Sequence, residues 1–73
     1  PLFAALRARR REIAVAAGVP PYVVFHDSTL REIAAARPGS LAALAELPGV
    51  GKAKLDRYGA AFLEVVRGFE EEV

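Results

Sequence analysis

Apolar side chains recur at helical intervals from the first residues of the chain. In residues 2–17 they are separated by three or four positions, or by sums of these steps, and so share one face of a predicted helix. Positions 9 and 10 would complete this face, but both are arginine. At least one of Arg9 and Arg10 must therefore lay its methylene stem on the core and extend its guanidinium to water. Gly18 suits the residue that closes the helix. The residues on the predicted face are Phe3, Leu6, Ile13 and Ala17.

Residues 19–25 are apolar throughout but include two prolines. Because proline disrupts the interior of a helix, we expect a short 3₁₀ turn or extended chain pressed onto the core. A second helix follows, for which Asp27 and Thr29 compete as the N-cap, and Pro38 with Gly39 ends it. Its predicted buried stripe is Leu30, Ile33 and Ala34.

Ser40 is the predicted N-cap of a third helix, which should stop near Leu47 because a proline follows. Its predicted stripe is Leu41, Leu44 and Leu47. The sharpest interruption of the pattern is the corner Leu47-Pro48-Gly49-Val50-Gly51, where the two glycines let the backbone reverse. We expect Val50 to pack into the core and to fix the angle between the helices on either side.

Helical periodicity resumes after this corner and continues to the end of the chain. Its apolar positions are Ala53, Leu55, Tyr58, Phe62, Val65, Val66 and Phe69. Gly59 interrupts the run and predicts a break or kink there. Glu70, Glu71 and Glu72 oppose the negative end of the helix dipole, so we expect the last turn to fray. The chain therefore predicts an all-α fold: a compact bundle of four to five short helices, with a helix-turn-helix corner at Leu47-Gly51.

Composition narrows the functions that such a bundle could have. With 73 residues the chain is one small domain with little room for a deep substrate pocket, and without cysteine it has neither disulfides nor thiolate metal sites. With a single histidine, we expect no metal site, and we expect no cofactor. We also expect no membrane span and find no signal peptide. Because the chain starts at Pro1 and has no methionine, residues 1–73 read as one domain cut from a longer protein.

The net charge of +1 does not favour a strong general nucleic-acid binder, but the cations are unevenly distributed. They form two groups, Arg7, Arg9, Arg10 and Arg11, then Lys52, Lys54 and Arg57. The start of the helix at Lys52 could hold a phosphate through its unpaired amides, although a plain corner between helices fits the spacing as well. Tyr22 is either a half-buried core tyrosine or one that stacks on a base or contacts a phosphate.

An independent enzyme is disfavoured. His26 next to Asp27 could suggest a catalytic dyad, but no supported serine or cysteine nucleophile accompanies them. The run from Gly49 to Lys52 is too short for a Walker loop and follows no predicted strand.

Four motifs in order along nearly the whole chain resemble the HRDC (helicase and RNase D C-terminal) domain. They are the segments 19–25, 27–34, 47–51 and 54–59, and the form Pro-Pro-Tyr-Val-Val-Phe is most similar to the version in RecQ-type helicases of bacteria. The resemblance implies a five-helix accessory module without catalytic activity, cytoplasmic and associated with the nucleoid through its parent helicase. By position it implies weak contact with single-stranded or branched DNA through Arg7, Arg10, Arg11, Tyr22, Lys52, Lys54 and Arg57.

Two departures from the family pattern favour an alternative role in protein contacts. Position 9 is usually apolar in RecQ-type members, and here it is Arg9. The first helix is also unusually apolar around Val15 and Ala16, and an exposed apolar patch often marks a contact site. The expected partner is then the helicase core, a sister domain of the same chain or a separate protein, with little DNA binding.

Overall fold

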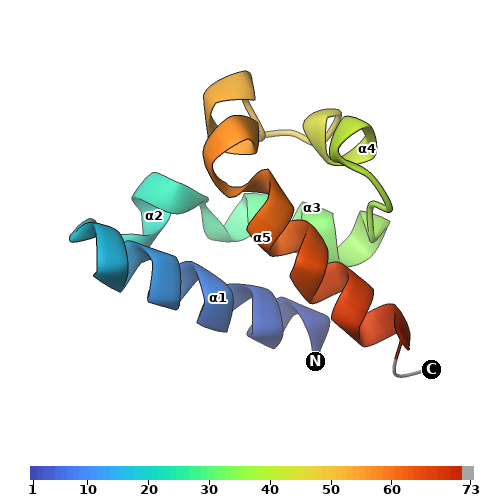
Figure 1. Ribbon diagram of the computed structural model, residues 1–73, viewed down its shortest axis with the longest axis horizontal. Helices are drawn as coiled ribbons and strands as arrows, with labels where there is room; N and C mark the ends of the chain where they lie inside the picture. Colours follow the sequence, from blue (N-terminus) through green and yellow to red (C-terminus); the bar gives the residue numbers. More distant parts are fainter. Residues whose placement is uncertain (72–73) are drawn as a thin grey trace.

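The computed structural model describes the backbone of residues 1–71 and the side chains of residues 1–69. Over this range the chain forms five α-helices and no β-strand, so the predicted all-α bundle is confirmed (Figure 1). α1 packs against α2, α3 and α5, and α4 packs against α5. The helices are α1 (Leu2–Ala17), α2 (Pro21–Val24), α3 (Asp27–Ala36), α4 (Leu41–Ala45) and α5 (Lys52–Glu71).

The buried face of α1 repeats every four residues and includes an arginine. It consists of Leu2, Leu6, Arg10 and Ala14, while Phe3 and Ile13 pack beside it and are only partly buried. Ala17, which the sequence placed on this face, is exposed because Ala14 takes the last buried position before the chain turns. Gly18 closes the helix as predicted, with a left-handed φ of 70°.

The proline-containing segment forms one turn of α-helix, so the expected 3₁₀ turn is wrong. Pro21 occupies the first helical position, where its missing N–H leaves no hydrogen bond unmade. Phe25 follows in extended conformation and is fully buried, which confirms the expectation that extended chain presses onto the core at this residue.

The N-cap of α3 lies one residue before the earlier of the two predicted caps. Its N-cap is His26, without a side-chain hydrogen bond, and Thr29 lies inside the helix with 4% of its surface exposed. Thr29 is not a cap because it packs against the corner after α4, where a Cβ on Gly49 would collide with its Oγ1. The helix ends at Ala36 and is followed by Arg37 in the left-handed region, with a φ of 47°.

The Ser40 cap and the packing of Val50 into the core are confirmed. Ser40 Oγ accepts a hydrogen bond of 3.1 Å from the Ala43 amide, and Val50 is 7% exposed within the core cluster. Leu44 is fully buried, but Leu41 is 45% exposed, so the predicted stripe of this helix is only partly correct. The corner turns at Gly49, whose φ is 86°.

α5 runs without interruption through Gly59, so the predicted break is wrong. A Cβ at this position would lie 2.9 Å from Leu41 Cδ2 and 3.1 Å from Leu55 Cδ1. Gly59 is therefore a site of close approach between α4 and α5 rather than a helix breaker. Ala53, on the predicted stripe, is exposed. Fraying was expected in the last turn, but α5 is helical as far as Glu71, and Glu72 lies outside the described residues.

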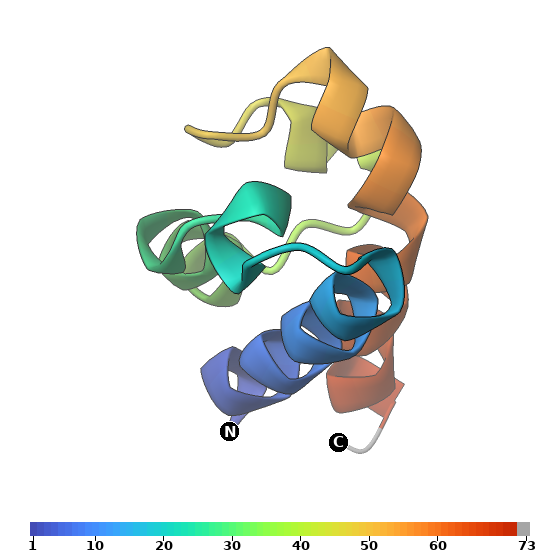
Figure 2. The same cartoon turned by 90° about the vertical axis from the view of Figure 1, so that its left-hand side faces the viewer.

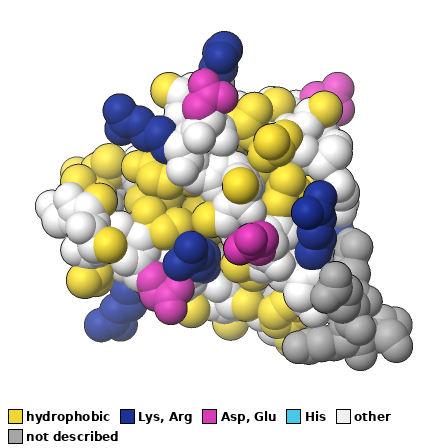
Figure 3. Space-filling view, in the orientation of Figure 1, with side chains coloured by type: hydrophobic (Ala, Val, Ile, Leu, Met, Phe, Trp, Pro, Cys, Tyr) yellow, Lys and Arg dark blue, Asp and Glu magenta, His cyan; other side chains and the backbone are white. Residues whose placement is uncertain are grey.

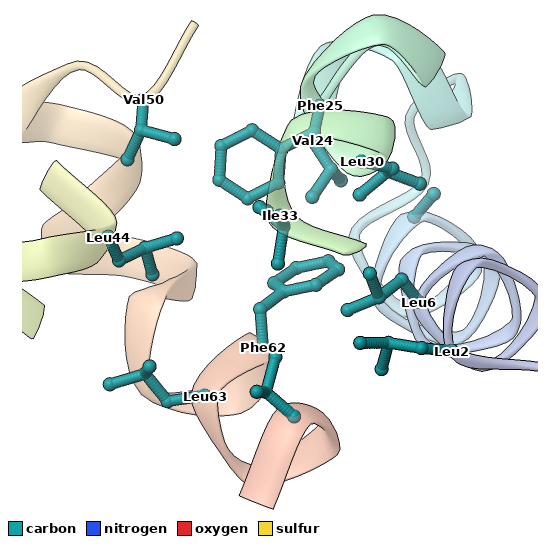
Figure 4. Close-up of a cluster of buried hydrophobic side chains, with 12 residues drawn as sticks. Leu2, Leu6, Val24, Phe25, Leu30, Ile33, Leu44, Val50, Phe62 and Leu63 are labelled. Carbon is teal, nitrogen blue, oxygen red and sulfur yellow. The ribbon is translucent and has the colours of Figure 1, made fainter. Parts of the chain in front are cut away.

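The core forms where side chains from all five helices and the corner meet (Figure 4). The rings of Phe25 and Phe62 pack edge to face with their centroids 5.1 Å apart. Leu6, Ile33 and Leu63 lie around Phe62 in the close-up. This packing joins the segment between α2 and α3 to α5.

Neither a membrane span nor a metal cluster is found in the part of the chain that the structure describes. No helix there is long and apolar enough to cross a bilayer. No three histidine, aspartate or glutamate side chains gather there as a set of metal ligands.

Candidate nucleic-acid interface

The three candidate arginines of α1 have different environments. Arg7 and Arg11 are exposed, whereas Arg10 is only 8% exposed. Arg10 Nη1 donates a 2.8 Å hydrogen bond to the carbonyl oxygen of Phe25, and Nη2 lies 2.7 Å from Asp27 Oδ1. The sequence predicted that at least one of Arg9 and Arg10 extends its guanidinium to water, and Arg10 does not, because its guanidinium finds two acceptors, the backbone carbonyl of Phe25 and the side-chain carboxylate of Asp27. Arg9 instead bonds with Glu12 at the surface.

The contact with Arg10 lowers the pKa of the Asp27 carboxyl group. The hydrogen bond from Arg10 lowers the pKa of Asp27 below its ordinary value of 3.8, and the positive charges of Arg10, Arg7 and Arg31 act in the same direction. Asp27 therefore stays ionised at neutral pH and compensates the charge of Arg10. One carboxylate thus lies among three guanidinium groups.

Phe3 brings together two arginines from different helices. The guanidinium carbon of Arg7 lies 5.8 Å from the centroid of the Phe3 ring, and that of Arg31 on α3 lies 5.4 Å from it. Sequence reasoning missed Arg31, because only the packing of α3 on α1 places it beside Arg7. No local signal identifies such a pair.

Tyr22 is accessible, as a nucleic-acid contact requires. Its side chain is 58% exposed, and its ring stacks on the ring of His26 with a centroid distance of 5.9 Å and an interplanar angle of 25°. The alternative of a half-buried core tyrosine is not supported by this exposure. His26, which sequence reasoning considered as a partner of Asp27 in a catalytic dyad, is the residue on which the tyrosine ring stacks.

The cations at the start of α5 are only partly free. Lys52 Nζ lies 3.3 Å from Asp56 Oδ2, an exposed pair that contributes little to stability. Lys54 is half-buried, with Nζ 5.8 Å from the centroid of the Phe25 ring. Arg57 is exposed. Lys54 thus ties the start of α5 to the residue that follows α2.

α2 lies between α1 and the start of α5 (Figure 2). Tyr22 therefore belongs to the element that separates the two groups of cations. On the face of the molecule in Figure 3, lysine and arginine side chains stand apart, with acidic side chains between them. The cations thus do not form one continuous patch on that face.

An open groove of about 610 Å³ runs along α1 and α2 beside Val15, one of the two candidate partner-contact residues. Val15 lines this groove and is 73% exposed, whereas Ala16 is exposed but does not line it. Among the described side chains, its lining includes arginines but no acidic residue: Ala4, Arg7, Ala8, Arg10, Arg11, Ala14, Val15, Val19 and Pro21.

The small all-α bundle described above is similar to a known family of domains. The family model of the HRDC domain matches residues 1–66. The chain belongs to the HRDC domain family.

Its relatives are segments of DNA helicases. The chain is 42% identical over 66 residues to the ATP-dependent DNA helicase RecQ of Haemophilus influenzae, and 43% identical over 68 residues to that of Bacillus subtilis. It is 45% identical over 67 residues to the ATP-dependent DNA helicase UvrD2 of Mycobacterium bovis. These matches cover 90%, 93% and 92% of this chain, but only 11%, 12% and 10% of the relatives.

A solved structure shares the fold. The chain superposes on HRDC domain 3 of Deinococcus radiodurans RecQ with a TM-score of 0.90 and 40% sequence identity. The match covers 93% of this chain and 90% of the other. The implied five-helix architecture is thus confirmed.

Proposed function

We propose that this chain is a non-catalytic accessory domain of a RecQ-type DNA helicase and contacts single-stranded or branched DNA weakly, without base-sequence preference. The assignment to a helicase is supported by the RecQ and UvrD2 relatives. On this proposal the domain works in the cytoplasm at the nucleoid, where its parent helicase acts. Its other contacts are with the helicase core or sister domains.

The observation that carries DNA contact is the exposed Tyr22 ring on α2. This helix lies between α1 and the start of α5, the two helices that carry the candidate cations (Figure 2). An exposed ring that is already stacked on one side can accept a base on its other face without losing much conformational freedom. The flanking cations that are exposed or partly exposed would contact phosphates on either side: Arg7, Arg11, Lys52, Lys54 and Arg57. Arg10 is excluded from this set because its guanidinium is used within the fold.

The expected affinity is modest. Stacking of one base contributes about 1–3 kcal/mol, and each phosphate contact adds a salt-dependent increment. With a few such contacts we expect a Kd on the order of micromolar or weaker. The sequence has no recognition-helix pattern that would read base edges, so we expect discrimination to follow DNA structure and not base sequence.

The test is fluorescence anisotropy of a labelled oligonucleotide titrated with the domain at two salt concentrations. Single-stranded and forked DNA are compared, each in two unrelated base sequences. Salt-sensitive binding that is equal for the two sequences supports the proposal. Absence of binding at low salt would contradict it.

The groove beside Val15 favours a second candidate function, contact with a protein partner. Its apolar lining and its arginines suit a helical segment that carries acidic side chains beside an apolar face.

Val15→Glu should abolish binding of such a helical segment. Ala16→Glu adds the same charge one residue away but outside the groove, and it should not abolish binding. The probe is a synthetic amphipathic peptide with glutamates beside its leucines, compared with a lysine counterpart. Equal binding of the two peptides would exclude this function.

A further inference from the structure

Arg7 and Arg31 meet at one aromatic ring although they lie on different helices. Both guanidinium groups are within 6 Å of the centroid of the Phe3 ring, at 5.8 Å and 5.4 Å, and both side chains are exposed. Phe3 itself is only partly buried against the core. The ring thus forms a surface platform shared by two cations.

Neither arginine is neutralised by a carboxylate among the side chains of residues 1–69. The ion pairs found there are Arg9 with Glu12, Arg10 with Asp27, and Lys52 with Asp56. Asp27 is the acid close enough for both Arg7 and Arg31 to lower its pKa, but its Oδ1 is already 2.7 Å from Arg10. Among the described side chains, Arg7 and Arg31 therefore meet at one ring with no ion-pair partner of their own.

Stacking on a ring orders a guanidinium without occupying its N–H donors. The donors lie in the guanidinium plane and point outward from its edge, so they stay available to an anion. A phosphate oxygen accepts such hydrogen bonds well, and bidentate contacts between arginine and phosphate are stronger than neutral ones. Because the ring restricts both side chains beforehand, less conformational freedom is lost on binding.

We infer that Arg7 and Arg31, ordered by Phe3, form a phosphate clamp for the backbone of the bound DNA strand. This inference rests on the proposed function and extends the interface from α1 onto α3. It assigns a role to Arg31 and Phe3. The clamp recognises the phosphodiester group and carries no base-sequence information.

The experiment compares Arg31→Gln with Arg37→Gln in anisotropy titrations of a labelled (dT)20 strand over a range of salt. Arg37 is also exposed and lies just beyond the same helix, but it is not at the ring. Arg31→Gln should weaken binding about 3- to 10-fold at low salt and should flatten the plot of log K against log salt by about 0.7, the value for one phosphate contact to a single strand. Arg37→Gln should change affinity less than about twofold.

Phe3→Leu tests the ordering effect of the aromatic ring separately from the charges of the two arginines. It retains both cations, so the salt slope should stay the same while the affinity falls. Circular dichroism melting of each variant shows whether the fold is intact under the conditions of the titration.

The outcomes distinguish the clamp from the proposed function. If the unmodified domain does not bind (dT)20 at all, the DNA-binding function itself fails. If it binds and Arg31→Gln behaves like Arg37→Gln, the clamp is wrong while DNA binding stands.

Nitrogen NMR of the arginine Nε–Hε groups tests whether the group bound at Arg31 is the phosphate of DNA or a free phosphate ion. Shifts at Arg31 with (dT)20 support the clamp, and shifts with inorganic phosphate but not with (dT)20 overturn it as a DNA contact.

Discussion

Arg10 and Asp27 join α1 to the first residue of α3, with 2.7 Å between Arg10 Nη2 and Asp27 Oδ1. The same guanidinium donates from Nη1 to the carbonyl oxygen of Phe25, which is fully buried. An arginine thus occupies the place of an apolar residue in the stripe between Leu6 and Ala14. It does so because its stem packs on the core while its head binds the backbone between α2 and α3.

Loss of the Arg10 side chain should destabilise the fold. Arg10→Ala removes the packed stem, leaves the buried Phe25 carbonyl without its donor and deprives Asp27 of its partner. We expect a loss of about 2–3 kcal/mol in the free energy of unfolding, measured by urea denaturation. Arg11→Ala, next to it and exposed, should stay within about 0.5 kcal/mol of the unmodified domain. Equal losses in the two variants would show that the Arg10 contacts contribute no stability.

The contribution of Asp27 should depend on pH. Its pKa is lower in the folded domain than in the unfolded chain, because Arg10 hydrogen bonds to the ionised form. Its stabilising effect is therefore complete above the unfolded value of about 3.8 and is lost as the pH falls through the folded value. The free energy of unfolding of the domain and of Asp27→Asn should differ at pH 6 and converge at low pH. A difference that is independent of pH would contradict this.

The two glycines of the corner should respond differently to substitution. Gly49 has a φ of 86°, and a Cβ there would collide with Thr29 Oγ1, so Gly49→Ala should lower the free energy of unfolding by about 2 kcal/mol or more. Gly51 has no left-handed φ, and a Cβ there would meet open space. Gly51→Ala should therefore stay within about 0.5 kcal/mol. Thermal melts of both variants test this, and a similar shift for both would be inconsistent with the geometry.

Tyr22 should contribute to DNA affinity without contributing a charge. Tyr22→Ala should weaken binding of single-stranded DNA by about 1–3 kcal/mol, the range for one stacked base, while the dependence of log K on log salt stays unchanged. Tyr22→Phe retains the ring and should bind nearly as well. Because the side chain is 58% exposed, the melting temperature should change little. Anisotropy titrations that find no loss for Tyr22→Ala would remove it from the interface.

Most of the helical pattern could be predicted because its causes are local. The stripe containing Leu30 and Ile33, the cap at Ser40 and the turn at Gly18 depend on residues within one or two turns of one another. The same reasoning failed at Gly59, where the need for a glycine comes from α4 rather than from the helix itself. It also failed for the cap of α3, since Thr29 is buried by contact with the corner.

The candidate site was less predictable than the fold. Sequence reasoning found Tyr22 and the cations by position, but it could not tell which guanidinium groups are free. Arg10 and Arg11 are neighbours in the chain, yet one is buried and paired and the other is exposed. The difference arises from the angular position of each on α1 relative to α2 and α3.

Local sequence is enough to predict an all-α chain with a corner at Gly49 and a core valine after it, because periodicity and backbone freedom are properties of adjacent residues. The contacts of Arg10 with Phe25 and Asp27, and of Arg7 and Arg31 with the ring of Phe3, could be seen only in the folded domain. Those contacts join residues on different helices. Their existence depends on how the helices pack, which no short stretch of sequence specifies.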